Sequence, residues 1–119
     1  MQKWVDFRAY NLKDGSLDKF HRLVIEGSLP LLAQHGVDVV AYGPSADGSS
    51  SYFLIRAYDS LEAMRAAEEA FYGSDAWRQG PREAILALIE SYTSIVLSLD
   101  AAAVDRLRAA SSTGNLKGG

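Results

Sequence analysis

The stretch that decides the fold is residues 4–12, which read Trp4-Val5-Asp6-Phe7-Arg8-Ala9-Tyr10-Asn11-Leu12. Apolar side chains alternate along it with polar or aromatic ones, and this alternation is typical of a β-strand with two different faces. The next residues, Lys13-Asp14-Gly15, interrupt the pattern and predict a turn. The chain therefore begins with a strand that turns directly into the next element.

An amphipathic helix is predicted after this turn, with Ser16 as its N-cap and Gly36 as the residue that ends it. Its apolar arc is Leu17, Phe20, Val24, Ser28 and Leu31. Pro30 lies inside the helix and removes one backbone donor, so a kink or break is predicted near Gly27 and Ser28.

Three more strands and a second group of helices follow. The strands are predicted at residues 37–42, 51–58 and 92–99, the first two being joined by a Gly/Ser-rich loop. A capping box, Asp59-Ser60-Leu61-Glu62, starts a helix that runs to Tyr72, and the later helical segments are a turn at 74–77, a helix from Pro81 and a terminal helix at 101–110. Residues 111–119 form a polar tail.

This order of elements predicts an α+β fold of the ferredoxin-like type, β-α-β-β-α-β, with an antiparallel sheet. The chain of 119 residues fits one such domain over residues 1–100, and residues 101–119 form a C-terminal extension.

Composition excludes several classes of function. The net charge is −3 and lysines and arginines are scattered, so we expect no nucleic-acid partner. The chain has no cysteine, and its two histidines lack spaced carboxylates, so no metal site is predicted. No phosphate-loop or dinucleotide signature is present, and no cofactor is expected.

Hydropathy gives a prediction about location. The N-terminal residues Met1–Asp6 contain no apolar leader segment, and no apolar run approaches about 18 residues. We therefore expect no membrane association and a cytoplasmic protein.

Strand parity divides the sheet into two faces. The uniformly apolar set is expected to pack under the helices: Val5, Phe7, Ala9, Val37, Val39, Ala41, Phe53, Ile55, Ala57, Ile95, Leu97 and Leu99. The other set is Trp4, Asp6, Arg8, Tyr10, Asp38, Val40, Tyr42, Tyr52, Leu54, Arg56, Tyr58, Tyr92, Ser94 and Val96. Tyrosine, tryptophan and arginine are enriched at protein interfaces, so we expect the second set to form an open face that a second copy covers. The predicted assembly is a homodimer closed into a dimeric α/β barrel, and the alternative is a monomer with a half-exposed sheet.

Several short motifs resemble those of the NIPSNAP family, within the dimeric α/β-barrel superfamily. They are Asp6-Phe7-Arg8-Ala9-Tyr10-Asn11-Leu12, the Leu-Pro-Leu-Leu of residues 29–32, Arg56-Ala57-Tyr58-Asp59-Ser60-Leu61-Glu62 and Ser74-Asp75-Ala76-Trp77. The resemblance covers roughly residues 4–99 and implies a dimer. Relatives in this superfamily include cofactor-free monooxygenases, haem-binding proteins and proteins without an established activity, so the resemblance narrows the function little.

Candidate chemistry centres on a few side chains. His21, within the apolar arc of the first helix, is a candidate general base or haem ligand, or else a hydrogen-bonded histidine at the edge of the core. Trp77 and Arg82 suit the mouth of a pocket for a planar anion, or else a hydrophobic plug and a solvated arginine. Arg8, Tyr10, Arg56 and Tyr58 can line a polar cavity or pair across the dimer interface. Glu68 borders the apolar stripe of the second helix and is interpreted as a solvated flank.

The leading hypothesis is therefore a dimeric protein that binds a small, aromatic or anionic molecule in a pocket between helices and sheet. If it is an enzyme, proton transfer or cofactor-free oxygenation fits these residues, with a histidine taking the proton and an arginine holding the anion. The alternatives are a non-enzymatic assembly module and a haem-binding protein that uses His21.

Overall fold

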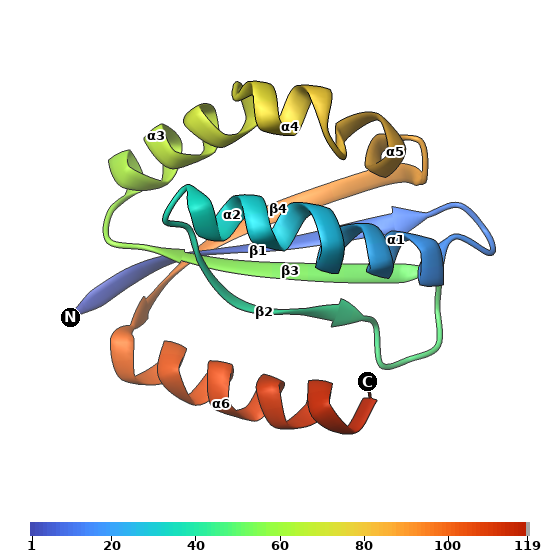
Figure 1. The fold of residues 1–119 in the computed structure, drawn as a ribbon. Coiled ribbons are helices and arrows are strands. Elements are labelled where there is room, and N and C mark those ends of the chain that lie inside the picture. Colours follow the sequence, from blue (N-terminus) through green and yellow to red (C-terminus); the bar gives the residue numbers. More distant parts are fainter. Residues whose placement is uncertain (119) are drawn as a thin grey trace.

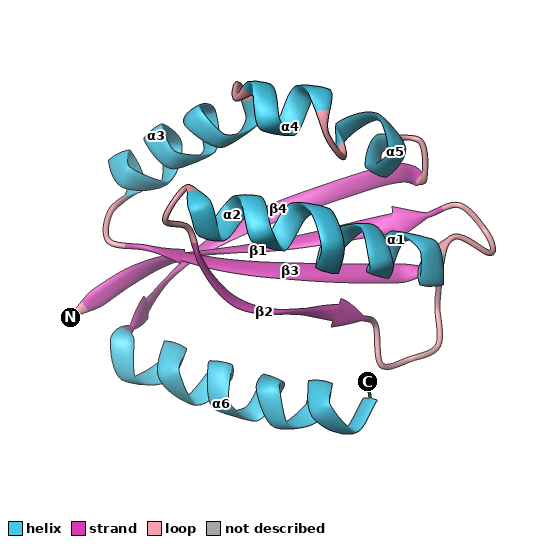
Figure 2. Cartoon of the chain, viewed as in Figure 1, coloured by secondary structure: helices cyan, strands magenta, loops and turns pink. Residues whose placement is uncertain are grey.

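The computed structural model describes the backbone of residues 1–118 and the side chains of residues 1–111. Its strands are β1 (Gln2–Leu12), β2 (Asp38–Pro44), β3 (Ser51–Tyr58) and β4 (Ile89–Asp100). Its helices are α1 (Leu17–Leu23), a π-helical segment η1 (Val24–Ser28), α2 (Leu29–Gln34), α3 (Leu61–Tyr72), α4 (Asp75–Gln79), α5 (Arg82–Leu86) and α6 (Ala101–Gly118). Figures 1 and 2 show the sheet between α3–α5 on one side and α6 on the other.

The four strands form one antiparallel sheet in the order β2-β3-β1-β4. The two central strands, β1 and β3, pair Asp6 with Arg56 and Phe7 with Ile55, and β1 also pairs Phe7 with Ile95 of β4. The predicted ferredoxin-like α+β fold is confirmed.

The first helix contains the predicted irregularity. Residues Val24–Ser28 form a π-helical turn, one turn before Pro30, and Gly36 ends the helix with a left-handed backbone (φ 72°). A Cβ atom on Gly27 would lie 2.9 Å from Cβ of Pro81, so glycine allows this helix to approach the segment between α4 and α5 closely. The side chain of Ser16, however, makes no capping hydrogen bond.

The helices α3 and α4 begin with serine caps. Ser60 Oγ accepts a hydrogen bond from the backbone N–H of Ala63 at 3.0 Å, and Ser74 Oγ accepts one from that of Trp77 at 3.2 Å. Pro81 takes the N-cap position of α5, one residue before the position predicted for it. The serine caps thus fix where α3 and α4 begin, while α5 begins without a side-chain cap.

The assignment of the two sheet faces was wrong. Tyr52, Leu54 and Tyr58 pack with the buried residues of α1–α5, whereas Val5, Ile55 and Ala57 pack with Val104 of α6. Outside β2, parity separates the two faces correctly, but it does not say which face the helices cover, and the prediction gave the helices the more apolar set. The face with tyrosines and arginines lies under α1–α5 instead, because those helices enclose polar groups as well as a core.

A bulge in β2 adds a second difference. Val39 pairs with Arg56, Ala41 pairs with Ile55, and Val40 is the extra residue between them. Val39 and Tyr42 therefore face α1–α5, while Val40 and Ala41 face α6.

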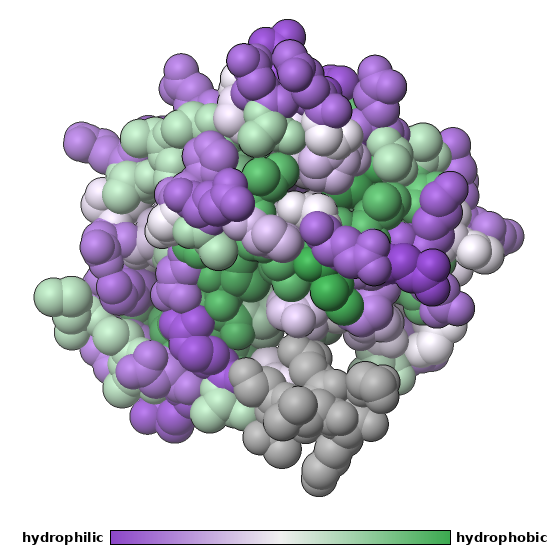
Figure 3. Space-filling model, viewed as in Figure 1, coloured by the Kyte–Doolittle hydropathy of each residue, from purple (hydrophilic) through white to green (hydrophobic). Residues whose placement is uncertain are grey.

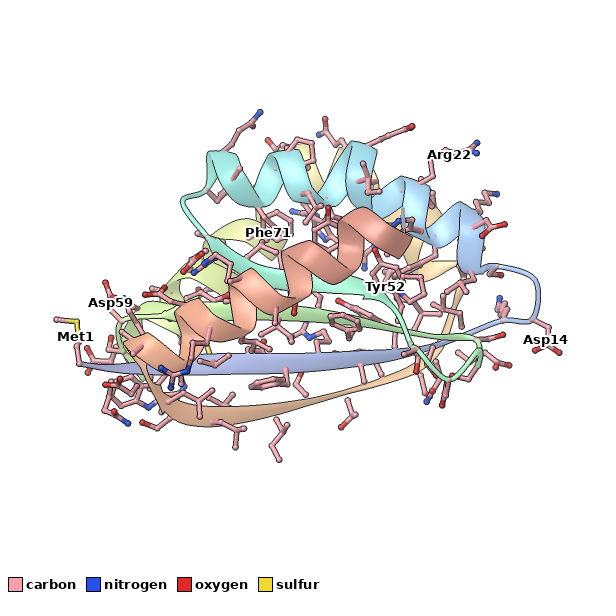
Figure 4. The ribbon with its side chains drawn as sticks, turned by 90° about the horizontal axis from the view of Figure 1, so that it is seen from below. Met1, Asp14, Arg22, Tyr52, Asp59 and Phe71 are labelled. Atoms are coloured by element: carbon pink, nitrogen blue, oxygen red, sulfur yellow. The ribbon has the colours of Figure 1, made fainter. Side chains whose placement is uncertain are left out.

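The C-terminal helix α6 covers part of the apolar face. Val104 is buried on it, and the Arg108 guanidinium donates hydrogen bonds of 2.8 and 2.9 Å to the carboxylate of Asp38. Figure 4, from below, shows α6 crossing the sheet. Ile95 and Leu97, on β4 at the sheet edge, stay 63% and 43% exposed. The helix runs beyond the predicted 101–110, into the predicted polar tail; the side chains of residues 112–119 lie outside the described part.

Candidate functional site

A cleft of about 440 Å³ lies between the sheet and the helices α3–α5. It is lined by Arg8, Tyr10, Glu68, Tyr72, Trp77, Arg82, Ile85, Leu86, Ile89 and Tyr92. Its volume falls in the range of about 300–1,000 Å³ that is usual for small-molecule sites. The front of the molecule shows apolar surface between patches of hydrophilic residues (Figure 3).

Arg8 lines the floor of the cleft, and the buried pair of Arg56 and Asp6 lies behind it. The side chains of Arg56 and Asp6 are 1% and 2% exposed, and Arg56 Nη2 donates to Asp6 Oδ2 at 2.8 Å. Arg8 Nη2 lies 3.5 Å from the same oxygen, and Arg8 Nε donates to Ser94 Oγ at 2.9 Å. Each guanidinium is therefore fixed in position before any ligand arrives.

Both arginines also hold the hydroxyl group of Tyr72. Nη1 of Arg8 and Nη1 of Arg56 each donate a hydrogen bond of 3.0 Å to this oxygen. Since the oxygen accepts two hydrogen bonds, its own proton is available for donation to a third group. The guanidinium of Arg8 further lies 5.8 Å from the ring centre of Tyr72 and 5.3 Å from that of Tyr92.

Glu68 completes the charged floor from the helix side. Its Oε2 lies 3.3 Å from Arg56 Nη2 and accepts a hydrogen bond of 3.4 Å from the Tyr58 hydroxyl. Burial, followed by a hydrogen bond with Asp6, raises the pKa of the Glu68 carboxyl, although Arg56 and Arg8 oppose the change. The prediction of a solvated flank was wrong, because the side chain of Glu68 is only 22% exposed and points into the cleft lining.

Tyr10 stays a neutral phenol over the ordinary pH range. Burial, and then the neighbouring Tyr72, raise the pKa of Tyr10 to about 12. It therefore contributes a hydrogen-bonding hydroxyl to the cleft, not a negative charge.

The aromatic wall and the rim come from α4 and α5. Trp77 is buried, and its ring centre lies 5.2 Å from that of Phe71 and 5.5 Å from that of Tyr72. Arg82, at the start of α5, is exposed, and none of the ion pairs within residues 1–111 involves it. Its guanidinium is therefore free to pair with a ligand.

The structure thus brings Arg8, Tyr10, Trp77 and Arg82 into one cleft, with Arg56 and, through Glu68, Tyr58 behind its floor. His21 lies elsewhere. Its Nδ1 is 2.7 Å from the hydroxyl of Tyr52, and it is not among the residues that line the cleft.

Sequence reasoning missed Glu68 and Tyr72 as members of the site. Met64, Glu68 and Tyr72 follow one another at four-residue spacing in α3, so all three lie on the face that packs on the sheet. That spacing was the available signal.

Within the described residues, no group of three His, Asp or Glu side chains could hold a metal ion, and none of the helices is long and apolar enough to cross a membrane.

The family model for NIPSNAP matches residues 5–103. This chain belongs to the NIPSNAP family. The motif resemblance to NIPSNAP is therefore confirmed, while no curated protein matches the sequence.

Solved structures agree with this assignment at the level of fold. A NIPSNAP family protein from Agrobacterium tumefaciens superimposes with a TM-score of 0.76 at 20% identity, covering 83% of this chain and 87% of its own. An uncharacterized NIPSNAP domain protein from Burkholderia xenovorans gives 0.74 at 20% identity, with coverages of 82% and 95%. A putative antibiotic biosynthesis monooxygenase from Nitrosomonas europaea gives 0.60 at 14% identity, with coverages of 82% and 89%.

Proposed function

We propose that this NIPSNAP family protein binds a small, planar, anionic molecule in the cleft between α3–α5 and the sheet. The observation that carries the proposal is the pair of arginines on two sides of one aromatic cleft: Arg8 on the floor and Arg82 on the rim. Trp77, Tyr72 and Tyr92 offer flat apolar faces to a ring between them.

The charges of the site support an anion. Among residues 1–111, the three guanidiniums of Arg8, Arg56 and Arg82 meet two carboxylates, those of Asp6 and Glu68, so one positive charge is in excess. Arg56 pairs with both carboxylates, whereas Arg8 lies 3.5 Å from Asp6 and Arg82 pairs with neither, so the excess charge lies at Arg8 and Arg82. A carboxylate or an enolate between these two guanidiniums gains charge-assisted hydrogen bonds in a partly desolvated site.

Catalysis without a cofactor is a further part of the proposal, as proton transfer or monooxygenation of such an acid. A putative antibiotic biosynthesis monooxygenase from Nitrosomonas europaea shares this fold, which is compatible with such catalysis. The similarity supports the fold alone, so the catalytic proposal depends on the residues of the cleft. Haem binding through His21, an assembly role and a cytoplasmic location stay predictions.

A thermal-shift experiment tests the binding proposal. Planar aromatic acids such as salicylate and phenylpyruvate are added to the wild-type protein, to Arg82→Ala and to Arg78→Ala. Arg78 is exposed on α4 and does not line the cleft, so it is the matched control. We expect an acid that binds to raise the melting temperature of wild type and Arg78→Ala, since ligand binds only the folded state, and to lose most of this effect with Arg82→Ala. Absence of any shift across the series, or equal shifts in all three proteins, contradicts the proposal.

Homodimer formation is proposed as well, through a surface different from the predicted one. The apolar face bears Phe7, Ile95 and Leu97 on β1 and β4, and Ile95 and Leu97 are exposed although they are large and apolar. A second copy that covers this strip removes apolar area from water, which is the main driving force of such interfaces.

A further inference from the structure

Two carboxyl groups of unequal environment share one guanidinium in the cleft. Arg56 Nη2 lies 2.8 Å from Asp6 Oδ2 and 3.3 Å from Glu68 Oε2. Asp6 is 2% exposed and is not part of the cleft lining, whereas Glu68 is 22% exposed and lines it. Of the two acids, only Glu68 can exchange a proton with a bound molecule.

We propose that Glu68 is the proton acceptor of the cleft, and that the ligand is a carbonyl compound with an acidic C–H group that leaves its proton on the Glu68 carboxylate. This inference rests on the proposed binding function, since it names the chemistry of the same cleft.

The proposed step balances within the site. The C–H bond breaks, the proton forms an O–H bond with the Glu68 carboxylate, and the electron pair of the C–H bond moves into the carbonyl group. The product is a planar enolate, whose charge pairs with Arg8 on the floor or Arg82 on the rim. Return of the proton to carbon regenerates the carboxylate, so the reversible exchange needs no oxidant and no cofactor.

Opposing effects act on the pKa of the Glu68 carboxyl group, and their net result suits this role. The titratable and charged groups that face it are Asp6, Arg8 and Tyr10 from β1, Arg56 and Tyr58 from β3, Tyr72 from α3, Arg82 from α5 and Tyr92 from β4. Burial and the hydrogen bond with Asp6 favour the protonated form, while Arg56 and Arg8 favour the ionised form. The first two effects outweigh the others, so the pKa of the Glu68 carboxyl is raised, and a raised pKa lies closer to neutral pH, where a carboxyl group both accepts and releases a proton readily.

The first experiment uses the ligand-free protein. Carbon-13 NMR of labelled glutamate side chains follows each carboxyl group through a pH titration, and Glu68→Gln identifies the signal of Glu68. Exposed Glu62 of the same helix is the internal reference. We expect Glu68 to titrate at a higher pH than Glu62. Coincident titrations overturn the proposal, whatever the ligand.

The second experiment measures proton transfer itself. Phenylpyruvate carries a carboxylate, an aromatic ring and acidic C–H bonds next to a ketone, and proton NMR in deuterium oxide follows the exchange of these hydrogens. We expect wild-type protein and Glu69→Gln, a variant of the exposed neighbour, to accelerate exchange, and Glu68→Gln to be slower by at least about a hundredfold.

A thermal shift on the same samples separates the two proposals. Glu68→Gln should still be stabilised by phenylpyruvate, since it retains Arg8, Arg82 and the aromatic wall. Exchange that wild type does not accelerate overturns the role of Glu68. If phenylpyruvate nevertheless raises the melting temperature of that wild-type protein, the binding proposal survives. If phenylpyruvate leaves the melting temperature unchanged, both proposals fail.

Discussion

The buried Asp6–Arg56 ion pair supports the floor of the cleft from behind. Replacement of Arg56 by methionine keeps most of the apolar stem but leaves Asp6 buried without its partner at 2.8 Å. Arg8 then remains beside the Asp6 carboxylate, at the longer distance of 3.5 Å. Because a buried charge that loses its closest partner is costly, we expect Arg56→Met to lower the free energy of unfolding by about 3–5 kcal/mol in urea denaturation.

Arg108→Met provides the control for this prediction. Arg108 pairs with Asp38 on the surface, where both side chains are more than a third exposed, and water already solvates the carboxylate. The expected loss is about 1 kcal/mol or less. Equal losses for the two variants would mean that the buried pair has no special weight.

Ionisation of Tyr10 should make the stability of the folded protein depend on pH in the alkaline range. Its pKa is raised from an ordinary 10.0 to about 12, so the folded protein holds the phenolic proton more tightly than the unfolded chain does. The resulting stabilisation is complete below pH 10 and is lost as the pH rises to about 12, which amounts to about 3 kcal/mol. Denaturation in urea at pH 9 and pH 11.5 should show a smaller decline for Tyr10→Phe than for wild type. Burial also raises the pKa of Tyr52 and Tyr58, and these remain in both proteins. An unchanged decline in Tyr10→Phe is the contrary result.

The sequence predicted which side chains lie in the site better than it predicted the contacts that those side chains make. Trp77 and Arg82 could be placed at a pocket from local sequence, because a capped turn and a Gly-Pro step put them on one connecting segment. The four-residue spacing could place Glu68 on the face of α3 that packs on the sheet, but not its ion pair, because that depends on how α3 lies over the Arg56 side chain of the preceding strand β3. His21 lies against Tyr52 for the same kind of reason, since strand order and helix placement decide its surroundings.

At the scale of elements, the contact between the first helix and the α4–α5 segment controls the position of α5. In Gly27→Ala the new methyl group would lie 2.9 Å from Pro81 Cβ and 3.3 Å from its Cγ, so one segment must move. We expect a loss of about 1–3 kcal/mol in the free energy of unfolding, as for other overpacked sites.

A double-mutant cycle identifies the cause. Pro81→Gly removes both carbon atoms, so Gly27→Ala should cost markedly less in that background than in the wild type. If the cost is the same in both backgrounds, the close approach to Pro81 is not its origin.

Elements themselves were largely predictable, and their orientation was not. Alternation, the capping box and the Pro30 irregularity are local signals, so they locate the strands and the helices up to α5 to within a few residues. The terminal helix α6 instead runs to Gly118, past its predicted end at residue 110. Which face of the sheet the helices cover is a global choice. Here α6 and the surface take the more apolar face, and the Asp6–Arg56 pair lies on the face under α1–α5.

For the whole molecule, the exposed strip beside α6 predicts the oligomeric state. Ile95 and Leu97 stay open because α6 packs mainly on β2, at the opposite edge of the sheet from β4. We expect the wild-type protein to sediment at micromolar concentration as a dimer of the 12.9 kDa chain, and Leu97→Glu to sediment as a monomer.

Ala66→Glu is the control for added charge, because Ala66 is exposed on α3, on the far side of the sheet. It should remain a dimer. A wild-type protein that sediments as a monomer contradicts the proposed interface and, with it, the barrel.

The bulge in β2 has a consequence for how the gene can change length. Asp38 and Val39 pair with Ala57 and Arg56, and Ala41 continues with Ile55, so Val40 has no partner of its own in β3. Deletion of Val40 would leave the register of every other β2–β3 pair unchanged and would remove one buried side chain. Residues 39 and 40 are both valine, so loss of either codon gives the same shorter protein, and loss of Ala41 would let Val40 pair with Ile55 in its place. The bulge is therefore where a shorter homologue can differ from the present chain while keeping the same sheet.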